Sequence, residues 1–101
     1  MIYSTVAPCK KKKGFEGHPD EFFNISLPQL NEVLSKSLPN YEILRKTSIM
    51  MMLVDKISGH KISIFPSARV FIHGSLDEEE AKKILLIISR AVIEISEKNS
   101  C

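Results

Sequence analysis

The sequence predicts an α+β domain in which an antiparallel sheet of four to five strands carries two helices on one face. Short runs between residues 41 and 73 alternate apolar and polar side chains and are separated by turn residues, as in hairpin-connected strands. Residues 27–38 and 77–97 repeat apolar side chains at helical spacing. A length of 101 residues fits a single domain over 1–101.

The first strand has two candidates in the N-terminal quarter. Residues 1–7 are rich in β-forming side chains and end at Pro8, whereas residues 21–25 are short and apolar. Residues 8–20 between them are rich in lysine, glycine and proline, which predicts a mobile loop.

The first helix is expected to begin after Ser26, whose hydroxyl can accept a hydrogen bond from an amide in the first turn. Gln29 at the third helical position completes a capping box, and Pro28 is tolerated in a first turn. Pro39 and Asn40 end this helix.

Four strands are expected to follow as a meander. In the first of them, Tyr41, Ile43 and Arg45 are expected on one side. Gly59 supplies the positive φ that the turn after the second strand requires. The four predicted strands are Tyr41–Thr47, Ile49–Ile57, Ile62–Phe65 and Arg69–His73.

The final helix is expected from about Asp77 to about Glu97. Asp77 can cap it, and the acidic residues 77–80 suit the positive end of the helix dipole better than they suit a catalytic or metal site. Leu86 and Ile93 point away from the apolar stripe and are candidates for a partner patch, or they are stray apolar residues. The stripe itself contains Ala81, Ile84, Leu85, Ile88, Ala91, Val92 and Ile95.

Composition restricts the compartment and the chemistry. The N-terminus lacks the features of a signal peptide, and no apolar run approaches the roughly 20 residues of a membrane span. Cys9 and Cys101 form no disulfide framework, so we expect a reduced, cytoplasmic setting without a membrane partner. The sequence has no catalytic motif, and neither an enzymatic activity nor a cofactor is expected.

The second half of the chain resembles one repeat of the TATA-box-binding protein family over residues 61–100. The residues that carry the resemblance are Ile64, Phe65, Ser67, Ala68, Arg69, Gly74, Glu78 and Glu79, without a gap. The resemblance implies a half-saddle fold whose concave, DNA-contacting surface holds Phe65, Ser67, Arg69, Phe71 and His73. The chain departs from the family because it has one repeat, carries Ala68 in place of a glycine, and has no aromatic residue at Ser48 or Ile49 to pair with the wedging phenylalanine.

Strand alternation leads to the same surface without the family. Ile62, Ile64, Val70 and Ile72 share the side that faces the helices. The open side then holds Ser63, Phe65, Arg69, Phe71 and His73, with Ser67 at its edge. The strand before them adds either Ile49, Met51 and Leu53 or Met50, Met52 and Val54, and we take Met50 and Met52 as site candidates.

Three interpretations of the open side follow. It can bind a protein partner or a second copy, since methionines suit adaptable interfaces. It can bind DNA or RNA, with Lys10, Lys11, Lys12 and Lys13 on phosphates, although a lysine run in a loop is more often only solvated. It can also be covered by the N-terminal segment through Phe15, Phe22 and Phe23. A non-catalytic binding module is the leading hypothesis and nucleic-acid binding is the alternative.

A metal site is not expected. Cys9, His18, His60 and His73 are potential zinc ligands, but their spacings match no ligand pattern. Cys9 beside the lysine run is favoured as a plain loop thiol, because no partner for catalysis accompanies it.

Overall fold

The computed structural model describes residues 2–3, 5–8, 14–74 and 77–99. The elements in chain order are β1 (Thr5–Pro8), β2 (Gly14–His18), α1 (Leu27–Ser37), β3 (Tyr41–Lys46), β4 (Met51–Asp55), β5 (Lys61–Ile64), β6 (Val70–His73) and α2 (Glu78–Asn99).

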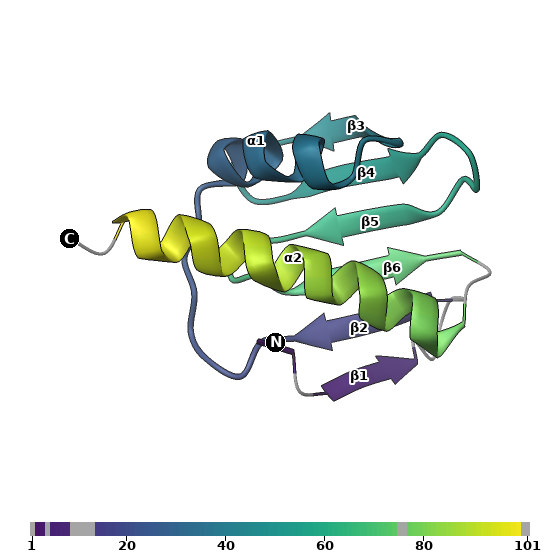
Figure 1. The fold of residues 1–101 in the computed structure, drawn as a ribbon, viewed down its shortest axis with the longest axis horizontal. Coiled ribbons are helices and arrows are strands. Elements are labelled where there is room, and N and C mark those ends of the chain that lie inside the picture. The colour runs from purple at the N-terminus through teal and green to yellow at the C-terminus, as the bar shows by residue number, and fades with distance from the viewer. Residues whose placement is uncertain (1, 4, 9–13, 75–76, 100–101) are drawn as a thin grey trace.

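The six strands form one sheet in the order β1-β2-β6-β5-β4-β3, and every neighbouring pair is antiparallel. Both helices lie on the same side of this sheet, α1 over the β3 and β4 end and α2 across the remainder (Figure 1). The predicted α+β architecture is therefore confirmed, with six strands in place of the expected four to five.

The N-terminal segment differs from the prediction. Residues 14–18, expected within the loop 8–20, form β2 and pair with β6 in the middle of the sheet. β1 covers only the end of the first candidate strand and continues through Pro8, while residues 21–25 form no strand. The glycines that predicted a loop serve close packing instead, since a Cβ on Gly14 would lie 1.9 Å from the Ile72 carbonyl oxygen.

Both helices begin as their cap residues predict. The Ser26 hydroxyl accepts from the Gln29 amide at 3.5 Å, and the Asp77 carboxylate accepts from the Glu80 amide at 2.8 Å. These side chains satisfy amides that have no partner within the first turn. The β4–β5 turn contains Gly59 at φ +81°, as expected.

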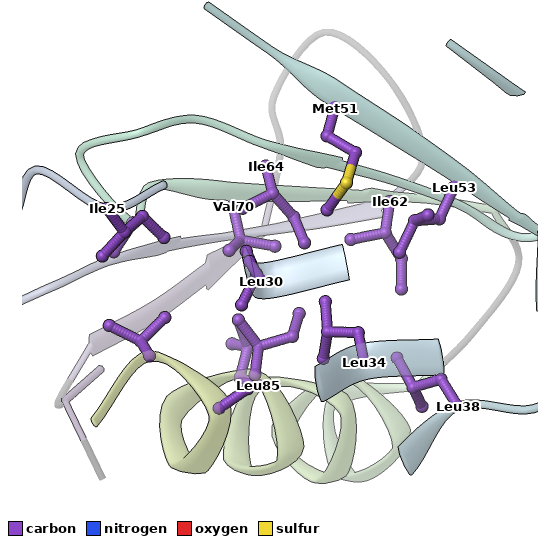
Figure 2. Close-up of a cluster of buried hydrophobic side chains, with 14 of the residues drawn as sticks. Ile25, Leu30, Leu34, Leu38, Met51, Leu53, Ile62, Ile64, Val70 and Leu85 are labelled. Atoms are coloured by element: carbon purple, nitrogen blue, oxygen red, sulfur yellow. The ribbon is translucent and has the colours of Figure 1, made fainter. Parts of the chain in front are cut away.

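The core lies between the helices and the sheet (Figure 2). Leu30 and Leu34 from α1 and Leu85 from α2 face the sheet side chains across this layer. Alternation correctly predicted the sheet half of the core, because Ile62, Ile64, Val70 and Ile72 are all fully buried.

Candidate functional site

The open face is the side of the sheet that points away from both helices. Its centre is a row of directly paired residues that crosses five strands, one residue from each. In order from β2 to β3, this central row is Glu16, Phe71, Ser63, Met52 and Arg45. A carboxylate and a guanidinium therefore stand at opposite ends of an apolar strip.

An aromatic cluster forms the β6 side of the open face. The Phe65 and Phe71 rings meet edge to face with centroids 5.9 Å apart. His73 stacks on Phe71 with centroids 6.3 Å apart. The Arg69 guanidinium carbon lies 4.9 Å from the Phe71 centroid, a favourable cation–π geometry. Four of the predicted site residues thus form one connected group around Phe71.

Methionine forms the β4 side of the face. Met51 and Leu53 are buried in the core, so the alternation places Met52 and Val54 on the open face, half-buried. Met50 is half-buried and immediately precedes β4. The structure therefore decides between the two sets that the sequence left open, in favour of the one that contains Met50 and Met52.

Ser63 is nearly buried although no helix covers it. Only 5% of its surface is exposed, because it lies between its two directly paired neighbours, Phe71 and Met52. The apolar strip is therefore continuous from β6 to β4, with a shallow point at its centre.

Glu16 and Arg45, the charged residues at the two ends of the central row, were missed by sequence reasoning. Glu16 is in a segment expected to be a loop, and it lies 3.5 Å from the imidazole of His18. Arg45 was expected beside Ile43, but the register shifts between Ile43 and Arg45 and turns Arg45 to the side of Met52. Only this bulge places a cation at the β3 end of the central row.

A second row runs beside the central one, with Gly14, His73, Lys61, Val54 and Glu42 in order from β2 to β3. Lys61 and Glu42 are exposed. The charges of the two rows, Glu16, Glu42, Arg45 and Lys61, are two acidic and two basic.

The interpretation in which aromatic residues of the N-terminal segment cover the open face is wrong for these residues. Phe15 pairs with Ile72 and, like Phe23, packs against the core on the helix side. Phe22 is 91% exposed. The N-terminal segment extends the sheet at its edge instead.

The remaining candidates lie in the turn before β6, on α2 or outside the described residues. Ser67 is exposed in the turn before β6, and Leu86 and Ile93 are each 37% exposed on α2. Lys10–Lys13 and Cys9 fall outside the residues that the structure describes.

Sequence reasoning also missed one hollow. About 450 Å³ of space lies between the start of α1 and the β3–β4 turn, lined by residues 24–28, 46–48 and 66. It forms between segments distant in sequence, so no local pattern indicates it.

Three ionisable groups that the fold perturbs, Tyr3, Tyr41 and Asp55, lie away from the open face. Burial raises the pKa of Tyr3, and burial together with the charges of Asp55 and Glu80 raises the pKa of Tyr41. The Ile57 amide, donating to the Asp55 carboxylate at 2.8 Å, lowers the pKa of Asp55. Asp55 pairs with Tyr41 on the helix side. These pKa shifts therefore come from burial in the fold and from the turn after β4.

Within the described residues, no three His, Cys, Asp or Glu side chains are grouped so as to hold a metal ion. In those residues there is also no helix with the length and apolar character of a membrane span. Comparison with protein-family models, curated proteins and solved structures found no match.

Proposed function

We propose that this chain is a non-catalytic, cytosolic binding module whose open face contacts another protein. One observation carries the proposal: a continuous strip of Phe65, Phe71, Met52 and Val54 lies on the side of the sheet that neither helix covers. Contiguous apolar patches of this kind mark interaction sites. Full burial of each phenylalanine would contribute on the order of 2 kcal/mol.

The balance of charge favours a protein over nucleic acid. Phosphate backbones select surfaces with a clear excess of lysine and arginine. On the two rows of the open face, Glu16 and Glu42 offset Arg45 and Lys61, and Arg69 beside Phe71 adds one positive charge. A partner that presents both signs of charge fits this surface better than a polyanion does.

We further propose that the fold is the half-saddle kind found in one repeat of the TATA-box-binding protein family. The order strand, helix, four strands, helix supports this proposal, with β2 as the first strand and β1 added before it. The placement of Phe65, Arg69, Phe71 and His73 in one cluster away from the helices also supports it.

Nucleic-acid binding is the second candidate. The observation that favours it is the Arg69 guanidinium on the Phe71 ring beside Phe65, since aromatic rings and arginine planes stack on bases. In this alternative Lys10–Lys13 contact phosphates.

A photo-crosslinking experiment tests the proposal. Benzoylphenylalanine replaces Phe71 on the open face or, as a matched control, Phe22, which is exposed and lies beside the end of α2 with Ile95 and Ser96. We expect protein adducts from position 71 and none from position 22, with purified protein alone or with an extract of the source organism. Failure of position 71 to form any protein adduct would contradict the proposal.

A titration separates the second candidate. Amide shifts of the labelled chain are followed as single-stranded or duplex DNA or RNA is added at low salt. Shifts confined to residues 62–73 that weaken steeply with salt would indicate that the open face binds nucleic acid and not a protein. No shift would remove the nucleic-acid candidate.

A further inference from the structure

The central row of the open face is complementary to itself when reversed. From β2 to β3 it reads acid, ring, small hydroxyl, thioether, base: Glu16, Phe71, Ser63, Met52, Arg45. Its middle residue, Ser63, is on β5, which has two of these strands on either side. Resting on the proposed function, we infer that the partner is a second copy of this chain, packed open face to open face about a twofold axis along β5.

The symmetry decides which side chains meet. A twofold axis along β5 lays β2 of one copy over β3 of the other and β6 over β4. Glu16 then faces Arg45 of the second copy, and Phe71 faces Met52. Each of these contacts occurs twice. The pairs are a carboxylate with a guanidinium and an aromatic ring with a thioether, and both are favourable.

The heights of the side chains also fit. Stacked sheets lie about 10 Å apart, a gap that two layers of large side chains fill. Phe71 and Met52 from the two copies converge around the axis, where Ser63 is small and already shielded by them. Within the central row, the charged residues Glu16 and Arg45 stand at the margins, at β2 and β3. The interface between the two copies therefore has an apolar centre and a charged rim.

One residue opposes this arrangement and provides a diagnostic. Lys61, at the start of β5, lies near the axis and faces Lys61 of the second copy. Removing this charge tightens a dimer packed in this way. The same change weakens binding to a polyanion. The direction in which the affinity changes therefore distinguishes a second copy of the chain from a polyanion on the open face.

The sharpest test is a charge exchange, measured by sedimentation equilibrium of the full chain. Because the five strands are short, we expect a weak dimer with a dissociation constant on the order of micromolar. Glu16→Arg and Arg45→Glu should each raise that constant about tenfold or more. The double variant, which restores both pairs with reversed sign, should return to within about threefold of the wild type, and Lys61→Gln should bind more tightly.

Exposed charges on the helices provide the controls. Glu32→Arg on α1 and Lys83→Glu on α2 make the same charge changes away from the open face and should leave the dissociation constant unchanged. Circular dichroism confirms that every variant is folded.

Two results would overturn the inference: a wild-type chain that stays monomeric, or folded single variants whose double variant fails to recover. Adducts from position 71 to a different protein would then leave the proposed function standing with another partner. The absence of any adduct would remove both.

Discussion

Tyr3 ties the N-terminal segment to the interior of the molecule. Its side chain is fully buried, and its hydroxyl donates a hydrogen bond to the Ala68 carbonyl oxygen. The amide of the preceding residue, Ile2, donates to the Ser89 hydroxyl at 2.8 Å. A buried phenol ionises with difficulty because its anion loses hydration, so burial raises the pKa of Tyr3 above its usual value of 10.0.

This raised pKa predicts a loss of stability in alkali. Below about pH 10 the phenol is neutral in the folded and unfolded chains, so its contribution is fully present. Above that pH the unfolded chain releases the proton first, and the free energy of unfolding falls. In urea titrations between about pH 9 and 11, Tyr3→Phe should show a shallower fall than the wild type. Equal slopes would contradict this assignment, since Tyr41 contributes to both proteins.

Ala68 occupies a conformation that favours glycine. Its φ is +72°, it is fully buried, and its amide donates to the Phe65 carbonyl at 2.9 Å within the β5–β6 turn. Glycine there would relieve backbone strain. It would also remove a buried methyl group and raise the conformational entropy of the unfolded chain.

We therefore expect Ala68→Gly to change the free energy of unfolding by less than about 1 kcal/mol, because these effects oppose each other. Ala68→Val should destabilise by about 2 kcal/mol or more, since a β-branched side chain is strained at positive φ. Chemical denaturation of the two variants measures both values. A neutral valine variant would show that the turn relaxes to another conformation.

At the scale of the elements, α2 has two adjacent leucines in opposite environments. Leu85 is fully buried against the sheet, whereas Leu86 is 37% exposed. Leu85→Ala should cost about 2–5 kcal/mol through lost contacts and a cavity, and Leu86→Ala should cost less than about 1 kcal/mol. Urea midpoints for this matched pair measure the difference. Comparable losses would mean that the outer side of α2 is also covered.

β2 depends on a glycine that contacts its neighbouring strand. Gly14 has φ +149°, and a Cβ there would lie 1.9 Å from the Ile72 carbonyl oxygen. Gly14→Ala should therefore destabilise by about 2 kcal/mol or more, as β2 moves away from β6. Gly59 is the control, since it also has positive φ but a Cβ on it would meet nothing within 4 Å. Equal losses for the two alanine variants would show that backbone conformation alone matters.

At the scale of the whole molecule, the two sides of the sheet have different roles. Ile72 and Phe71 are adjacent on β6, but Ile72 is fully buried beneath the helices and Phe71 belongs to the open face. We expect Ile72→Asp to unfold the chain, because an unpaired carboxylate in the core costs several kcal/mol. Phe71→Asp should keep the fold and abolish binding through the open face.

Circular dichroism and thermal melting of these two variants would measure whether each is folded, and sedimentation would measure whether each associates. A folded Ile72→Asp variant, or a Phe71→Asp variant that still associates, would contradict the assignment of the two sides.

Much of this arrangement was predictable from local pattern. Ser26 and Asp77 indicated where both helices begin, and the alternation from Ile62 to Ile72 correctly assigned the core side of β5 and β6. From that assignment the positions of Phe65 and Phe71 followed. β2 was not predictable in the same way, because its residues Gly14 and Gly17 are typical of a loop.

By itself, the sequence determined the helices, the meander and which side of β5 and β6 faces the core, because cap chemistry and side-chain periodicity act over a few neighbouring residues. Only the tertiary structure decided that Glu16 and Arg45 end one common row. That row requires β2 to pair with β6 and a bulge to turn Arg45 to the open face. Both depend on contacts between distant segments, and a local pattern does not encode those contacts.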